Sequence, residues 1–257
     1  MLGRLSRRLH DVRAGLAARR DAAHTRRRIA DFARTASPDQ VVDFLFTDDA
    51  RAIQPWQIPA EFRALARLVA ERRPRVVLEI GTADGGTLFA HARCAHEQAL
   101  LISIDLPAGP FGGGYPAWRI PLYRSFAGPA QQLELLRLDS HAPGTITVLE
   151  RILAGRRVDY AFIDGDHTCD GVRQDFELCR RFAARDAIIA FHDIAAQPNP
   201  EWLAAAATAP GDGAVHEFWS RVKRDYAHEE YIDDPAQEGY GIGVLYLDRP
   251  RAAGDAP

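Results

Sequence analysis

The stretch VVLEIGTADGGT, residues 76–87, constrains the fold more than any other part of this chain. It opens with an apolar run, as expected of a strand that is buried on both faces of a sheet. Glycines follow at Gly81, Gly85 and Gly86, and residues 87–99 have helical spacing. A strand, a glycine-rich turn and a helix form the first unit of a nucleotide-binding α/β sheet. The sequence therefore predicts an α/β fold that begins with this unit.

Two kinds of nucleotide ligand are disfavoured at this turn, because residues that their binding motifs require are missing. A phosphate-binding loop needs a lysine after its last glycine, but Thr87 follows Gly86 and the only lysine is Lys223. The dinucleotide-binding pattern also fails, because Ala83 stands where its second glycine should be. Glu79 would repel a pyrophosphate but suits a cationic ligand. A glycine turn that binds no ligand remains the alternative.

The pattern ExGxxxGGT over residues 79–87 resembles motif I of class I S-adenosylmethionine (SAM) methyltransferases. SAM carries an ammonium and a sulfonium group and has no phosphate, which agrees with the carboxylate in the pattern. The resemblance implies that the contacts to SAM come from Glu79, Gly81, Thr82, Gly85 and Thr87.

Acidic residues after the next two strands fit the same ligand. Asp105 follows a buried strand at 100–104, where an acidic residue commonly accepts hydrogen bonds from ribose hydroxyls. A surface aspartate that merely ends the strand is the alternative. Asp139 and Ser140 close a third strand, and in the methyltransferase plan this turn lies near the adenine. We therefore expect either of them to hydrogen-bond the adenine.

Composition limits the remaining classes of protein. A length of 257 residues accommodates one large α/β domain with an extension, and a net charge of −3 gives no argument for nucleic-acid binding. The three cysteines form no CxxC pair, and Cys94 and Cys179 are expected to be core residues in a reducing cytoplasm. The sequence has no apolar run long enough for a membrane span and no signal-peptide core. We expect a cytoplasmic protein.

The first 36 residues predict an arginine-rich helical arm. Acidic residues at Asp11, Asp21 and Asp31 argue against a mitochondrial presequence. The arm either packs on its own domain or on a sister subunit, as in a homo-oligomer, or it docks on an acidic surface. Residues 1–54 are predicted to be this arm and its connection, and residues 55–257 the main domain. One face of the arm carries Leu2, Leu5, Leu9, Val12 and Leu16.

The rest of the chain alternates between strands and helices. The loop at 107–119 is rich in glycine and proline and follows a strand end, so Tyr115, Trp118 and Arg119 either line a substrate mouth or belong to an ordinary loop. Ser37 or Asp39 is expected to cap a short helix that ends at residue 46. Further helices are expected at 59–70, 122–126, 145–154, 170–184 and 215–226. Strands are expected at 76–80, 100–104, 133–138, 158–163, 187–191 and 241–247.

Two carboxylates and an imidazole follow the fourth and fifth strands. Asp164 comes directly after the fourth strand, and His192 and Asp193 end the fifth. If these parallel strands are neighbours, the three side chains converge beside the glycine turn, because parallel strands end at one edge of a sheet. Such a set can hold a divalent cation, and a buried acidic cluster without a cation would repel itself.

The segments FIDGDHTCDGVRQDFELC and IIAFHDI resemble metal-dependent small-molecule O-methyltransferases. The resemblance includes the macrocin and mycinamicin sugar O-methyltransferases and the cephalosporin-hydroxylase-like proteins, over about residues 57–247. This resemblance implies a Rossmann-like three-layer αβα sandwich around a mostly parallel, seven-stranded sheet with an antiparallel last strand. It also implies that Asp164, His192 and Asp193 hold Mg²⁺. Asp164 is expected to contact SAM as well.

His192 departs from this family, which usually has a carboxylate at that position, so Mn²⁺ or another transition ion remains an alternative. A base must also take the proton of the acceptor hydroxyl, and Asp166 and His167 are the candidates. A histidine occupies the position of His167 in the mycinamicin-type enzymes, and Asp166 is expected to orient it. The alternative for His167 is a histidine that only holds the turn.

The predicted function is therefore SAM- and metal-dependent transfer of a methyl group to a hydroxyl of a small molecule. The resemblance points to a sugar of a natural product or a glycan as the acceptor. Two other functions remain open on the sequence. The first is a methyltransferase that needs no metal, and the second is a SAM-binding, non-catalytic partner protein.

Overall fold

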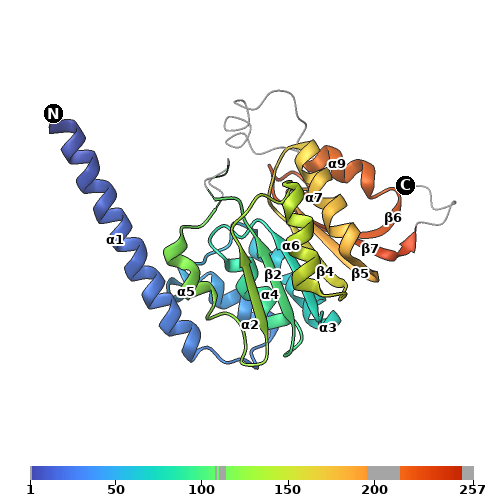
Figure 1. Ribbon diagram of the computed structural model, residues 1–257, viewed down its shortest axis with the longest axis horizontal. Coiled ribbons are helices and arrows are strands. Elements are labelled where there is room, and N and C mark those ends of the chain that lie inside the picture. Colours follow the sequence, from blue (N-terminus) through green and yellow to red (C-terminus); the bar gives the residue numbers. More distant parts are fainter. Residues whose placement is uncertain (1, 108, 110–113, 196–214, 251–257) are drawn as a thin grey trace.

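A seven-stranded sheet forms the middle layer of the protein in the computed structural model (Figure 1). The strand order is β3-β2-β1-β4-β5-β7-β6, with β1 to β5 parallel and β7 antiparallel to both of its neighbours. This is the predicted Rossmann-like sheet. The strands are β1 (Val76–Ile80), β2 (Leu100–Ile104), β3 (Gln132–Leu136), β4 (Val158–Ile163), β5 (Ala183–His192), β6 (Tyr226–Tyr231) and β7 (Ile242–Pro250).

The structure describes the backbone of residues 2–107, 109, 114–195 and 215–250. The side chains of residues 2–13, 249 and 250 also lie outside the described part. Within it, no helix combines the length and the apolar character that a membrane crossing requires.

Helices cover both faces of the sheet because successive strand residues point to opposite sides. On one face, Val77 of β1 packs in an apolar core with α2 (Pro38–Leu45), α3 (Pro59–Arg72) and α4 (Gly86–Cys94). On the other face, Leu78 packs with α6 (Pro143–Leu153), α7 (Cys169–Phe182) and α9 (Val215–Val222). Cys94 and Cys179 are both buried in these cores, as predicted. Shorter helices lie at η1 (Asp48–Ala50), η2 (Ala117–Arg119) and α5 (Ile120–Tyr123).

The order of the strands reverses between β1 and β4, since β1 pairs with β2 on one side and with β4 on the other. Open α/β sheets bind their ligands in the crevice at such a reversal, beyond the carboxyl ends of the strands. The glycine turn after β1 and the acidic turn after β4 therefore meet at the position where this fold places a ligand.

Helix α1 (Leu2–Asp31) combines a projecting part with a packed part (Figure 1). Its second half belongs to the core of the domain, because Ala22 and Ile29 are buried there and Arg28 pairs with Asp49 at 2.9 Å. Leu16 is 57 % exposed. Of the predicted apolar stripe, the side chains of Leu2, Leu5, Leu9 and Val12 lie outside the described residues. The domain boundary at residue 54 stays a prediction.

Some elements differ from the predicted ones. Strand β6 lies almost wholly where no element was predicted, since it shares only Tyr226 with the helix predicted at 215–226, and α9 ends at Val222. β6 is an edge strand with the polar sequence YAHEEY, so it lacks the apolar pattern of a buried strand. β5 begins at Ala183 instead of residue 187, because its first residues lie beyond an irregularity in the pairing with β4. The predicted cap of α2 is Ser37, which forms a reciprocal capping box with Gln40.

Candidate active site

The glycine turn after β1 is shaped by close contacts with two other segments. Gly81 has a φ of +91°, and a Cβ atom there would lie 1.9 Å from the backbone oxygen of Asp164. At Gly86, the first residue of α4, a Cβ atom would lie 2.3 Å from the backbone oxygen of Ile53. Only glycine allows both approaches. The turn therefore brings the β1 end, the β4 end and the residues before α3 together.

Asp105 closes this turn from the end of β2. It is 6 % exposed, and its carboxylate accepts the backbone N–H groups of Ala83 and Gly114, each at 2.9 Å. Burial raises the pKa of Asp105, and these N–H groups oppose the rise. The hydroxyls of Thr82 and Ser103 hydrogen-bond each other beside it. The predicted residues Thr82 and Asp105 therefore lie together, and Asp105 joins the glycine turn to the loop after β2.

Glu79 lies beneath the turn in a fully buried polar network. Its Oε2 is 2.9 Å from Nδ1 of His91 on α4, and Nε2 of His91 is 3.0 Å from the hydroxyl of Tyr160 on β4. Burial raises the pKa of Glu79, although the His91 and Thr87 side chains oppose this. The network ties β1, α4 and β4 together below the glycine turn.

The predicted adenine-side residues lie further along the same edge, after β3. Asp139 is exposed, and its Oδ1 accepts the backbone N–H of His141 at 2.8 Å. Ser140 beside it is half-buried. His141 in turn lies 3.0 Å from the buried carboxylate of Asp175 on α7, which raises the pKa of His141. The sequence analysis did not single out this histidine.

The loop after β2 is described only in part, because residues 108 and 110–113 lie outside the described residues. Tyr115 is buried and packs edge-on against Tyr123 at 4.7 Å between ring centroids. The guanidinium of Arg119 pairs with Asp84 of the glycine turn at 2.8 Å. Tyr115 and Arg119 thus contribute to the packing of the turn.

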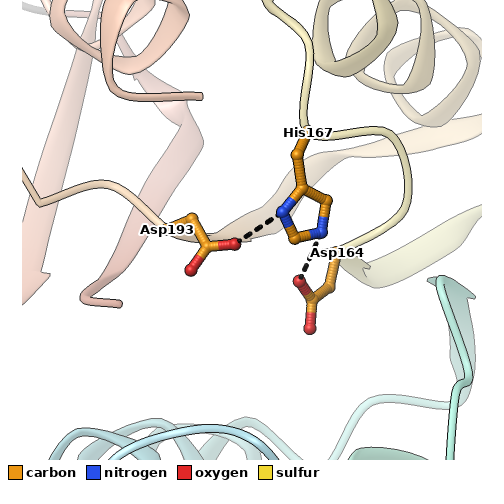
Figure 2. A group of neighbouring side chains, drawn as sticks. All are labelled: Asp164, His167 and Asp193. Atoms are coloured by element: carbon orange, nitrogen blue, oxygen red, sulfur yellow. Dashed lines mark ion pairs between the residues drawn. The ribbon is translucent and has the colours of Figure 1, made fainter. Parts of the chain in front are cut away.

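A second group of polar side chains follows β4 and β5. These strands are paired, with Ile163 opposite Phe191, so the residues after them meet as predicted. Figure 2 shows the ring of His167 between the carboxylates of Asp164 and Asp193. Nδ1 of His167 is 3.0 Å from Oδ2 of Asp193, and its Nε2 is 3.7 Å from Oδ1 of Asp164. One ligand atom from each residue lies within 4.8 Å of the others, a span that suits a metal ion.

His192, the predicted third ligand, contacts the same carboxylates from a buried position. Its Nδ1 lies 3.2 Å from Oδ1 of Asp164 and 3.1 Å from Oδ1 of Asp193. Burial alone would lower the pKa of His192, but the two carboxylates raise it well above the ordinary value. The compact group of Figure 2 contains His167, which was not a predicted ligand, while His192 as a ligand stays a prediction. Sequence spacing could not separate the two histidines, because their side-chain directions depend on the turns.

The state of Asp193 agrees with a cation site. Its φ of +63° is uncommon for a residue with a side chain, although aspartate tolerates it better than most. Within the described part of the chain, both carboxylate oxygens are buried and neither is aligned with a hydrogen-bond donor. Two imidazole nitrogens lie within 3.1 Å of this carboxylate, and its hard oxygen atoms are the ligands that Mg²⁺ and Mn²⁺ prefer. The residues present therefore fit a divalent cation.

Asp166 shapes the turn that carries His167. Its Oδ1 accepts the backbone N–H of Thr168 at 2.8 Å, and Thr168 caps α7 by accepting the N–H of Gly171. A Cβ atom at Gly171 would lie 2.1 Å from the carboxyl carbon of Asp166. Asp166 therefore has a clear structural function in this turn.

Gln57 is a site residue that the sequence analysis missed. Its Nε2 donates to Oδ2 of Asp164 at 2.8 Å, and its side chain is buried. It precedes α3 and lies 107 positions before Asp164 in the chain. No local pattern marks such a contact, so only a three-dimensional structure could find it.

Comparisons with known proteins agree with this geometry. A family described as a methyltransferase domain matches residues 78–194, from β1 to the end of the acidic cluster. An O-methyltransferase from Bacillus cereus in complex with SAH has a TM-score of 0.52 at 16 % identity, over 80 % of this chain and 90 % of that one. A putative O-methyltransferase from Klebsiella pneumoniae has a TM-score of 0.51 at 15 % identity, over 81 % and 90 %.

No curated protein matches the sequence. At identities of 15–16 % the structural likeness establishes the fold, while the family match covers the segment that carries the site. The segment from β1 to the acidic cluster therefore matches a methyltransferase domain, and the sheet has the Rossmann-like fold of these two structures.

Proposed function

We propose that this protein transfers the methyl group of SAM to a hydroxyl of a small molecule, with a divalent cation held by Asp164 and Asp193. The observation that carries this proposal is the acidic cluster beside the glycine turn. The backbone of Asp164 lies against Gly81, so a cation at its carboxylate would be next to the bound cofactor. Both structural neighbours are named as O-methyltransferases, which supports oxygen as the accepting atom.

The glycine turn and the strand ends around it would bind SAM. Gly81 and Gly85, both with positive φ, allow the cofactor to approach the backbone closely. Asp105 would accept hydrogen bonds from the ribose hydroxyls, while Glu79 holds α4 beneath the turn through His91. Asp139 and Ser140 would face the adenine.

The acidic cluster would prepare the acceptor. A bound divalent cation lowers the pKa of a coordinated hydroxyl and fixes its direction of approach. Asp164 and Asp193 would hold the cation through carboxylate oxygens, and His192 would orient both carboxylates from behind. The side chain of His167 is 23 % exposed, the largest fraction in the cluster. With its Nδ1 facing Asp193, Nε2 is the atom that would accept the hydroxyl proton.

The acceptor class is proposed from resemblance. The segments that carry Asp164 and Asp193 resemble those of the macrocin and mycinamicin sugar O-methyltransferases. We therefore propose a sugar hydroxyl of a natural product or glycan.

A methyl-transfer assay tests the proposal. Tritiated SAM would be incubated with a panel of glycosides, catechols and polyols, with EDTA and after readdition of Mg²⁺ or Mn²⁺. We expect transfer to at least one glycoside, its loss in EDTA and its recovery with metal. Full activity in excess EDTA would rule out the cation. SAM binding without transfer to any hydroxyl would favour the non-catalytic partner protein.

A substitution at His167 separates its two candidate roles. His167→Gln should lower turnover by about a hundred- to ten-thousand-fold while leaving SAM and Mn²⁺ affinities near those of the wild type, because a base is lost and no ligand. A parallel loss of Mn²⁺ affinity would make His167 a metal ligand instead. Near-normal turnover at pH 7 would pass the role of base to Asp166.

A further inference from the structure

We propose that Gln57 is a positioning residue for the cation site, and that the segment before α3 is thereby a structural part of the active site. This inference rests on the proposed function, since it concerns how Asp164 is held ready for a cation. It starts from a contact between two residues that lie in different parts of the chain.

The contact selects one oxygen of Asp164. Gln57 donates from Nε2 to Oδ2 at 2.8 Å, while Oδ1 faces Nδ1 of His192 at 3.2 Å and Nε2 of His167 at 3.7 Å. The opposite orientation of the amide would place its oxygen against a carboxylate, so the hydrogen-bond partner defines the donor. With Oδ2 engaged by Gln57, Oδ1 is the oxygen directed toward the cluster. Gln57 thus determines how this carboxylate presents itself.

The carbonyl oxygen of the Gln57 amide lacks a hydrogen-bond partner among the described residues. Gln57 is 4 % exposed, and within the described part of the chain its Oε1 is buried with no hydrogen-bond partner. A buried acceptor without a donor destabilises the folded state, so an apolar residue would be the more stable choice for filling this space. An amide at this position is therefore better explained by its donor group than by packing.

The segment that carries Gln57 is fastened to the glycine turn. Ala52 and Ile53 are buried in the core, and Nη1 of Arg119 donates to the backbone oxygen of Ala52 at 2.9 Å. The same Nη1 pairs with Asp84 in the glycine turn at 2.8 Å. The backbone of Ile53 also lies so close to Gly86 that no side chain fits between them. The segment that carries Gln57 therefore contacts both Asp164 and the glycine turn on which SAM is proposed to lie.

Groups that hold metal ligands in place tune a metal site without touching the ion, and their replacement commonly lowers metal affinity by about ten- to a hundred-fold. Gln57 stands in this relation to Asp164. It should therefore affect cation binding far more than SAM binding, although its segment borders the turn on which SAM is proposed to lie.

The test compares Gln57→Met with the wild type in the full-length protein. Methionine has nearly the same length and volume but no donor, so packing is kept while the hydrogen bond is lost. Calorimetric titration with Mn²⁺ alone should show an affinity about ten- to a hundred-fold weaker, and titration with SAM should show little change. Gln54→Met, at an exposed position in the same segment, should bind Mn²⁺ as the wild type does.

A second variant covers the case in which Gln57→Met does not fold. Gln57→Asn retains the amide, but its side chain is one methylene too short for the 2.8 Å contact, so it should lose Mn²⁺ affinity to a similar degree. Mn²⁺ affinity equal to the wild type in a folded variant would overturn the role of Gln57 while leaving the cation site in place. A wild-type protein that binds no Mn²⁺ would overturn the cation site itself and this inference with it.

Discussion

Asp105 and Asp193 hold equivalent places in the sheet but have opposite surroundings. Each follows the end of a parallel strand, and they are 6 % and 7 % exposed. The Asp105 carboxylate receives two backbone N–H groups, from Ala83 and Gly114. That of Asp193 receives no aligned donor in the described part of the chain, and lies beside the imidazoles of His167 and His192.

This difference separates two ways of preparing a site. On the β2 side, burial raises the pKa of Asp105, and backbone groups that folding itself positions satisfy the carboxylate. On the β5 side, burial would also raise the pKa of Asp193, but the charges of His192 and His167 lower it below its ordinary range. The first carboxylate is fixed by backbone N–H groups and keeps acceptor capacity for ribose hydroxyls. The second is balanced by charge, which is the state in which a cation can replace or join the imidazoles.

The largest expected effect comes from removing the charge on the β5 side. Asp193→Asn should lower turnover by about a thousand-fold, because a catalytic cation contributes several kcal/mol to transition-state stabilisation. SAM affinity, measured by calorimetry in the same preparation, should remain near the wild-type value. A matching loss of SAM affinity would show that the two sides of the site are not independent.

The next effect concerns the point at which the two sides touch. Gly81→Ala places a Cβ atom against the Asp164 backbone at a φ of +91°, so we expect the free energy of unfolding to fall by about 2–4 kcal/mol. Urea unfolding measures this change. Gly144→Ala on α6 is the control, since a Cβ atom there would meet nothing within 4 Å. The control should lose no stability and gain about 0.4–1 kcal/mol, because alanine suits a helix better than glycine. Equal losses in both variants would contradict the explanation by close backbone approach.

Asp105→Asn is the corresponding substitution on the β2 side of the site. Hydrogen bonds to a charged group contribute about 1.5–3 kcal/mol, so SAM affinity should fall by about ten- to a hundred-fold. Mn²⁺ affinity should remain unchanged, because Asp105 lies on the other side of β1 from the cluster. A variant that loses Mn²⁺ and keeps SAM would reverse the assignment of the two sides.

The sequence predicted the parts of this molecule that have local signals. The apolar runs and the glycines of residues 76–87 predicted the first strand, turn and helix, because a doubly buried strand and a positive φ both restrict residue type. The polar edge strand β6 has no such signal and was missed. Its residues pair on one side only, so tertiary pairing with β7 decides its structure.

The candidate site shows the same limit. The meeting of Asp164 and Asp193 followed from the rule that parallel strands end at one edge, and the pairing of β4 with β5 confirmed it. The turn that Asp166 shapes decides whether the His167 ring lies between the two carboxylates. Residue spacing does not contain that information. The contact of Gln57 with Asp164 depends on how a remote segment packs on Gly86.

The smallest expected effect concerns Glu79, the buried carboxylate below the glycine turn. Burial raises the pKa of Glu79 above the value of 4.5 that it has when exposed, so the folded state disfavours the ionised form. This penalty is fully present above the folded-state pKa and vanishes below about 4.5. Glu79→Gln should therefore be more stable than the wild type near pH 8, and the difference should shrink on acidification. Urea unfolding across this range measures it, with the exposed Glu97→Gln as the control for loss of a carboxylate. A difference that grows on acidification would instead show that the contact with His91 favours the ionised form in the folded protein.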